Sequence, residues 1–165
     1  MNSTLFPLPA NMSENEIISP ALHRQLAATL FNQVWSLIEQ PQRTVEEDLQ
    51  MIHAAHASRY HWGQVGTAKE WSIGEWQIAR VYAVLKRADA AAYHAAHALR
   101  WARDDSVAPF YKAYAFEALA RAHALVGDTV KFDRCLAEAR LLLEAVTDPE
   151  ERKLLSADLM SLARP

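Results

Sequence analysis

The chain has 165 residues, 51% of them hydrophobic and 22% charged, which suits one globular domain that buries a core without metal or disulfide staples. Its formal net charge of −3 argues against a nucleic-acid partner, and the lone cysteine, Cys135, excludes a disulfide framework within the chain. No apolar stretch reaches the roughly 20 residues of a membrane span and no signal peptide is visible, so we expect a cytoplasmic protein without a membrane partner.

The first helix signals follow a segment, residues 1–18, that reads as a flexible N-terminal extension. Ser19 and Pro20 are typical of an N-cap followed by the first helical position. Pro41 ends this first helix, and Thr44 with Glu47 forms the capping-box pattern that starts the second. Apolar residues after these signals recur at spacings of three and four rather than alternating, which predicts helices throughout.

Further along the chain, Asp89 and Asp128 are the predicted N-caps of the fourth and sixth helices. Gly127 is the left-handed residue expected after the fifth helix, and Asp148 followed by Pro149 starts the last. The predicted helices span residues 20–39, 44–62, 70–86, 89–104, 109–126, 129–146 and 149–163.

The sequence also repeats itself at an offset of 41 residues. The string HAAHA, then one variable residue, an arginine and an aromatic residue, begins at His53 and again at His94. A second pair of similar segments begins at Ala79 and Ala120, at the same offset. The two matches predict recurring helix–turn–helix units, which cannot bury their apolar faces alone and must stack on their neighbours.

These units resemble tetratricopeptide repeats, although 41 residues exceeds the usual length of roughly 34. The residues at the signature positions are Glu75, Ile78, Ala79, Tyr82, Ala91 and Ala95 in the second unit and Phe116, Leu119, Ala120, His123, Phe132 and Leu136 in the third. The stretch from His53 to Asp158 is also similar to a group of uncharacterised bacterial tetratricopeptide-like proteins. The resemblance implies an all-α, right-handed solenoid of three αα-hairpins with a C-terminal capping helix, forming one domain over residues 19–165.

In tetratricopeptide-like proteins the first helix of each hairpin lines the concave groove, which implies three columns of groove residues here. The columns are Trp35, Trp76 and Glu117; Glu39, Arg80 and Arg121; and Asn32, Ile73 and Tyr114. Trp, Tyr and Arg dominate binding hot spots, and arginine pairs bidentately with carboxylates. We therefore expect a groove for an extended acidic or C-terminal peptide of a partner protein, formed by Trp35, Trp76, Arg80, Tyr114, Glu117 and Arg121.

These residues allow two interpretations. If the groove is exposed, exchanging Arg80 and Arg121 for alanine leaves the fold mostly intact, because exposed ion pairs stabilise a protein by only about 0–1 kcal/mol. Alternatively, Glu39, Arg80, Glu117 and Arg121 form an ion-pair ladder and the tryptophans belong to the core between repeats.

The histidines are the other conspicuous feature. His53 with His56 and His94 with His97 each share a helix face, while His61 and His123 stand apart. Stacked helices lie about 8–10 Å apart, whereas zinc holds nitrogen ligands at about 2.1 Å, so the two pairs are not expected to converge. No carboxylate is obvious beside either pair. We expect no metal site and expect the histidines to form hydrogen bonds along the helix stack.

Other chemistry finds little support. Arg59–Trp62 and Gly63 open what is predicted to be the longest internal connection, reaching Trp71, where a functional loop would fit. Cys135 falls within a helix, where thiols are usually buried and inert. No G-x-S-x-G, phosphate-loop or dinucleotide pattern occurs, so neither a catalytic residue nor a cofactor is predicted.

Three hypotheses follow from the sequence. The preferred one is a non-catalytic helical-repeat module that takes a peptide or a partner protein in its concave groove. The second is a histidine-dependent, metal-binding enzyme centred on the HAAHA strings. The third is a structural protein that forms a homodimer through the apolar ends of its solenoid.

Overall fold

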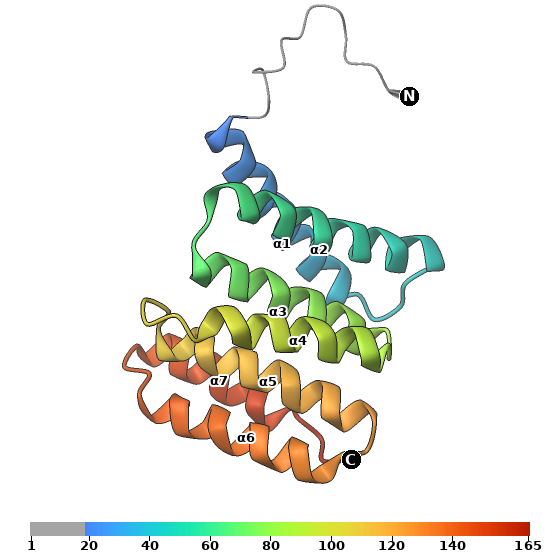
Figure 1. The fold of residues 1–165 in the computed structure, drawn as a ribbon. Helices are drawn as coiled ribbons and strands as arrows, with labels where there is room; N and C mark the ends of the chain where they lie inside the picture. Colours follow the sequence, from blue (N-terminus) through green and yellow to red (C-terminus); the bar gives the residue numbers. More distant parts are fainter. Residues whose placement is uncertain (1–18) are drawn as a thin grey trace, which may run out of the picture.

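The computed structural model describes residues 19–165, which form seven α-helices and no strand (Figure 1). The helices are α1 (Pro20–Ile38), α2 (Val45–Val65), α3 (Ala68–Val84), α4 (Ala88–Ala102), α5 (Pro109–Leu125), α6 (Thr129–Glu144) and α7 (Pro149–Met160). The predicted all-α chain is confirmed. The predicted flexible extension, residues 1–18, lies outside the described residues. None of the described helices is both long enough and apolar enough to cross a membrane.

Most helix ends follow the local signals in the sequence. The Ser19 hydroxyl accepts a hydrogen bond from the backbone of the first turn of α1, and Thr44 and Glu47 satisfy each other's backbone donors at the start of α2. Asp128 caps α6, and Gly127 before it has a φ of 71°, in the left-handed region. The predicted capping role of Asp89 is wrong.

The N-cap of α4 is Arg87, and Asp89 lies inside the first turn. A carboxylate in the first turn still interacts favourably with the positive end of the helix dipole, which explains why an acidic residue marks this helix start.

The connection between α2 and α3 is short, so the predicted long loop is wrong. Only Gly66 and Thr67 separate the two helices, and the Arg59–Trp62 segment lies within α2. The Thr67 backbone N–H donates to the Glu70 carboxylate at 2.9 Å, which starts α3 earlier than predicted. Trp71 Nε1 donates to the Trp62 carbonyl at 3.0 Å and ties the two helix ends together.

Consecutive helices pack closely in the pairs α1/α2, α3/α4 and α5/α6, and α7 packs against α5 and α6 (Figure 1). The second and third pairs share one register, because α3 and α5 begin at Ala68 and Pro109, and α4 and α6 begin at Ala88 and Thr129, in both cases 41 residues apart. The first pair does not repeat the second along its whole length, because α2 has 21 residues and its counterpart α4 has 15.

Small residues allow the paired helices to approach closely. In α4 one face is a stripe of alanines, none more than 1% exposed: Ala91, Ala95, Ala98 and Ala102. The Ser72 hydroxyl of α3 donates to the backbone carbonyl of Ala98 at 3.0 Å, and Ser58 of α2 donates to the carbonyl of Ala27 in α1 at 2.8 Å. Hydroxyl-to-carbonyl contacts of this kind require neighbouring helices without bulky residues between them, which explains the alanine content of the HAAHA strings.

We predict that enlarging the alanine stripe destabilises the protein. Ala95→Leu should lower the free energy of unfolding by about 1–3 kcal/mol, because extra methylenes in a filled core force neighbours apart. The matched control is Ala96→Leu, at the adjacent, exposed position of the same helix. Urea denaturation of both variants measures the difference. Equal stability of the two variants would contradict the close packing of α4.

Candidate functional site

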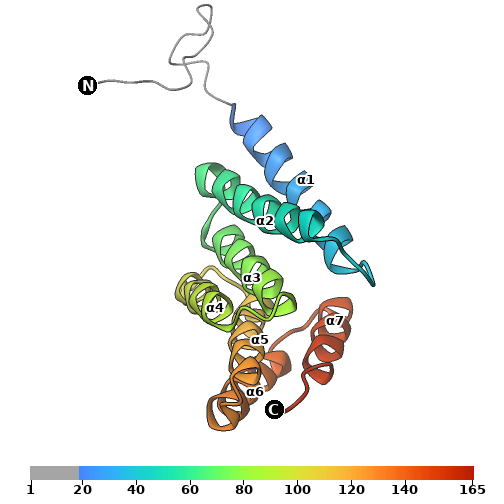
Figure 2. The same cartoon turned by 90° about the vertical axis from the view of Figure 1, so that its right-hand side faces the viewer.

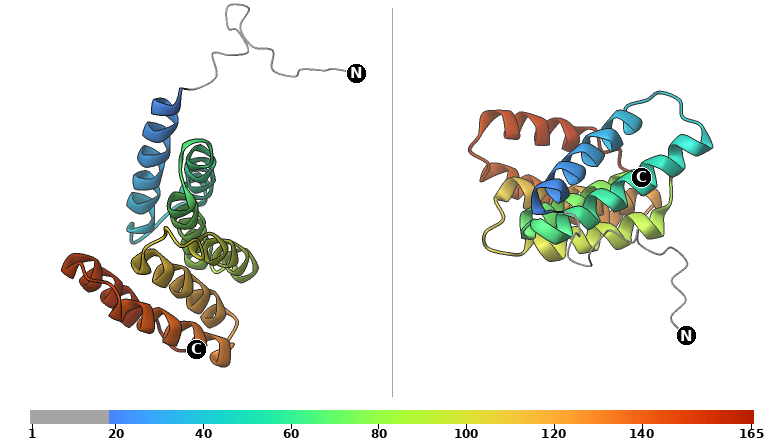
Figure 3. Two further views of the ribbon diagram at one scale, coloured as in Figure 1. Left: turned by 60° about the vertical axis from the view of Figure 1, so that its left-hand side comes forward. Right: turned by 90° about the horizontal axis from the view of Figure 1, so that it is seen from above.

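A cavity of about 660 Å³ lies on one side of α3 and α5, between α1 and α7. Both α1 and α7 stand on this side of α3, and the two do not contact each other (Figure 2 and Figure 3). We call the space between them the α1–α7 groove. Six aromatic residues from α1, α3 and α5 line its cavity: Phe31, Trp35, Trp76, Phe110, Tyr111 and Tyr114.

The aromatic rings form a continuous floor. Ring centroids are 6.4 Å apart for Phe31 and Trp35, 5.5 Å for Trp35 and Trp76, 4.8 Å for Trp76 and Tyr114, and 5.0 Å for Tyr114 and Phe110. These distances are typical of tilted and edge-to-face aromatic pairs. The contact between Trp35 and Trp76 joins two residues that the 41-residue repeat places at equivalent positions.

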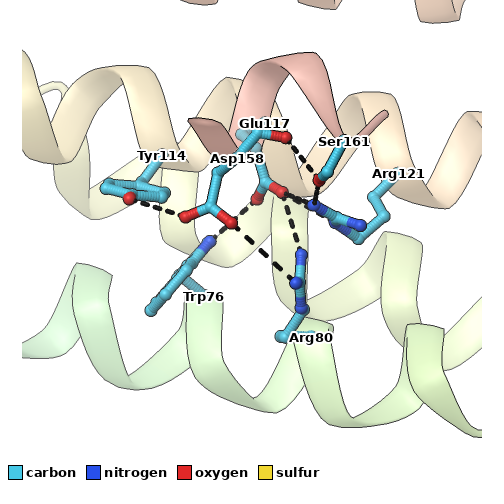
Figure 4. Close-up of polar contacts among 7 residues, drawn as sticks. All are labelled: Trp76, Arg80, Tyr114, Glu117, Arg121, Asp158 and Ser161. Carbon is cyan, nitrogen blue, oxygen red and sulfur yellow. Dashed lines mark hydrogen bonds and ion pairs between the residues drawn. The ribbon is translucent and has the colours of Figure 1, made fainter. Parts of the chain in front are cut away.

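Glu117 lies beneath this floor and not in the groove. Its side chain is 0% exposed, and its carboxylate accepts hydrogen bonds from Trp76 Nε1 at 3.0 Å, Arg80 Nη1 at 3.2 Å and Arg121 Nε at 2.7 Å (Figure 4). Two guanidinium groups and an indole therefore surround one buried carboxylate. Such an arrangement satisfies the charge of Glu117 within the protein.

Helix α7 joins the same network through Asp158 and Ser161. Tyr114 donates its hydroxyl proton to Asp158 Oδ2 at 2.8 Å, and Asp158 Oδ1 lies 4.0 Å from Arg80 Nη2. Arg121 Nη2 donates to Ser161 Oγ at 3.4 Å. Burial and the hydrogen bond to Asp158 raise the pKa of Tyr114, so its hydroxyl stays neutral and acts as a donor.

The predicted groove residues occupy three different environments. Trp35, Trp76, Arg80 and Tyr114 line the α1–α7 cavity, and Trp76, at 8% exposed, also belongs to the core, as the alternative expected. Glu117 is fully buried, and Arg121 lines an adjoining cavity of about 440 Å³, to which Arg80 also contributes. The third predicted column divides in the same way.

Ile73 lies in the α1–α7 cavity with Tyr114, and Asn32 in a neighbouring cavity of about 300 Å³. Of the predicted charge ladder, the Arg80–Glu117–Arg121 part is present. Glu39 lines the cavity and takes part in none of the ion pairs of the described residues. Asp158 was missed, because it lies on α7 outside the repeat and nothing in its neighbourhood marks it as a groove residue.

The three cavities adjoin one another along α3. The smallest shares Ile73 with the α1–α7 cavity and reaches back to Lys69, while the cavity beside Arg80 reaches forward to Val84. Three cavities therefore lie in a row along α3, and the middle one is the cavity of the α1–α7 groove.

Two of the four HAAHA histidines, His56 and His94, form hydrogen bonds with side chains of α3. The ring of His94 donates from Nδ1 to Glu75 Oε2 at 2.7 Å, and Glu75 Oε1 accepts from Arg59 Nε at 3.0 Å. His56 Nε2 lies 3.0 Å from the Tyr82 hydroxyl. Burial raises the pKa of Glu75, but the hydrogen bond from His94 and the charge of Arg59 outweigh it and hold that pKa below its usual value.

The prediction that no carboxylate accompanies either histidine pair is wrong for His94. Glu75 is brought to it by the packing of α3 against α4, which the spacing within one helix cannot show. Within residues 19–165, no group of three or more histidine, cysteine, aspartate or glutamate side chains is arranged to hold a metal ion.

A further histidine pair joins α1 to α2. His23, only 7% exposed, places its Nδ1 2.8 Å from Nδ1 of His61. One ring must donate and the other accept, so the contact requires at least one neutral histidine. This contact could not be predicted from the sequence, because the two residues are far apart in the chain and His23 has no partner at helical spacing.

No protein-family model, curated protein or solved structure matches this chain.

We predict that acid destabilises the protein through His61 and His56. Burial lowers the pKa of His61, with a further contribution from His23, and burial and His94 lower the pKa of His56. The unfolded chain takes up these protons near pH 6.5, whereas the folded chain resists them. The stabilising contribution is therefore complete above about pH 6.5 and is lost as the pH falls below it.

The measurement is the thermal unfolding temperature at pH 7.5 and at pH 5.5. The decrease should be smaller for His61→Gln than for the wild type, and unchanged for His53→Gln at an exposed position of the same helix. An equal decrease in all three proteins would contradict the role of the His23–His61 contact.

We also predict that Arg80 and Arg121 stabilise the fold. The double variant Arg80→Ala, Arg121→Ala leaves the buried Glu117 carboxylate without a counter-ion, which should lower the free energy of unfolding by about 3–5 kcal/mol. Adding Glu117→Gln removes the uncompensated charge and should restore part of this stability. Urea denaturation measures both; a double variant as stable as the wild type would support the exposed arrangement expected from the sequence.

Proposed function

We propose that this protein is a non-catalytic binding module that takes an apolar segment of a partner protein in the α1–α7 groove. The observation that carries the proposal is the continuous aromatic floor from Phe31 to Phe110. Its cavity of about 660 Å³ falls in the range of about 300–1,000 Å³ typical of ligand sites. Tryptophan and tyrosine supply most of the energy at binding hot spots, and both are present here.

The extent of the groove favours a peptide over a small molecule. The adjoining cavities follow α3 from Lys69 to Val84, which at about 1.5 Å per residue corresponds to about 22 Å. A small molecule fills only one of these cavities, whereas a peptide segment of a partner contacts all three.

The ligand we propose is less acidic than the sequence suggested. Arg80 and Arg121 are both engaged with Glu117, and Arg80 also faces Asp158. Because these charges are compensated within the protein, we place most of the binding energy in the aromatic floor and not in the capture of a carboxylate.

We also infer that the three helix pairs are tetratricopeptide-like repeats that form a right-handed solenoid closed by α7. The shared 41-residue register of the second and third pairs supports this, as does the contact between Trp35 and Trp76.

The test is Leu154→Glu, which places a charge in the wall of the groove. Leu154 is 57% exposed on α7, so the change should not disturb the fold. The matched control is Leu141→Glu on α6, where the leucine is 69% exposed and lines none of the three cavities. Peptides selected from a random display library against the immobilised full chain serve as probes.

We expect the selected peptides to be rich in bulky apolar residues. They should bind the wild type and Leu141→Glu equally and Leu154→Glu at least about tenfold more weakly. Selection of no peptide, or equal binding to both variants, would refute the proposed function.

A further inference from the structure

The walls of the α1–α7 groove are all helical, which limits what they offer to a ligand. Helices α1, α3, α5 and α7 use their backbone N–H and C=O groups internally, except at their ends. They therefore present only side chains, and no free edge with which an extended peptide could form a backbone hydrogen-bond ladder.

Three polar side chains around the floor are also engaged within the protein. Trp76 donates to Glu117, Tyr114 donates to Asp158, and Ser72 donates to the carbonyl of Ala98. An extended segment pressed against this floor would bury its own amides without partners, a cost that recurs at every residue. A helix satisfies its own backbone and contacts the groove with side chains alone.

The cavity lies between two walls that are separate from each other. α1 and α7 stand on the same side of α3 and α5 without touching each other (Figure 2). The row of cavities, about 22 Å long, matches a helix of about 15 residues, whose apolar side chains at spacings of three and four would follow this row along α3.

The charges around the cavity favour a basic occupant. Glu39 is an exposed carboxylate on the α1 rim, and Asp158 lies on the opposite wall. Against these two negative charges, the residues that line this cavity carry one positive charge, that of Arg80. The flanks of a bound helix would therefore face a net negative rim, with Glu39 as the residue free to pair with a lysine or an arginine.

We infer that the groove binds a basic amphipathic α-helix of a partner protein, held by apolar side chains on the aromatic floor and by lysine or arginine beside Glu39. This inference rests on the proposed function, because it names the occupant of the same groove.

Three fluorescent synthetic peptides of about 15 residues test it. The first consists of Leu and Lys with leucines at helical spacing, the second has the same composition with strictly alternating leucines, and the third replaces every Lys of the first by Glu. Fluorescence anisotropy with the full chain gives each affinity, and circular dichroism shows whether the peptide gains helicity on binding.

We expect the helical Leu/Lys peptide to bind at least about tenfold more tightly than the other two and to become helical. Leu154→Glu should weaken its binding about tenfold and Leu141→Glu should not. Glu39→Lys should reduce the preference for Lys over Glu in the peptide. Its control, Glu138→Lys, makes the same charge change at an exposed position of α6 and should leave that preference unchanged.

The possible failures are distinguishable. If the alternating peptide or the Leu/Glu peptide binds more tightly and Leu154→Glu still blocks it, the groove binds peptides but the basic-helix inference is overturned. If Glu39→Lys and Glu138→Lys act equally, the charge assignment to Glu39 is wrong. If Leu154→Glu affects none of the peptides and none of those selected by display, the proposed function fails as well.

Discussion

The geometry of the groove depends on the buried carboxylate of Glu117. A charge withdrawn from water is tolerated only where its partners are close and well oriented, and here they are two guanidinium groups and an indole N–H. Because Trp76 is one of these donors, the same interaction that neutralises Glu117 also sets the orientation of the ring at the centre of the aromatic floor. The floor is thus fixed from below by electrostatics and from the sides by ring contacts.

A second carboxylate acts in the same way on another side of α3. Glu75 joins Arg59 of α2 to His94 of α4, much as Glu117 joins Arg80 of α3 to Arg121 of α5. Both acidic residues connect helices of neighbouring pairs, so each provides directional contacts between elements that otherwise meet through small apolar residues. The difference lies in the partners, because Glu75 accepts from one guanidinium and one histidine ring, whereas Glu117 accepts from two guanidinium groups and an indole.

The helices could be predicted because their signals are local: apolar spacing, a capping box at Thr44 and Glu47, and a glycine at position 127. The capping box at Thr67 and Glu70 is a local signal of the same kind, but the predicted third helix begins only at residue 70. The contact of Trp35 with Trp76 followed from the repeat offset. The burial of Glu117 could not follow from it, because the offset assigns a column but not the depth of a side chain. That depth depends on the packing of α5 against α3, which brings Trp76 and Arg80 onto the carboxylate.

The two walls of the groove are attached to the floor in different ways. α7 inserts Leu155 and Leu159 into the core and bonds to α5 through Asp158. α1 packs mainly against α2 and only slightly against α3, where Gln77 donates to the carbonyl of Phe31 at 2.9 Å. The first pair is held to α3 mainly through α2, because Val81 of α3 shares a core with Val34 of α1 and Met51 of α2. The two walls therefore rest on different parts of the core, so a substitution beside Val34 and Met51 displaces one wall and a substitution beside Leu155 displaces the other.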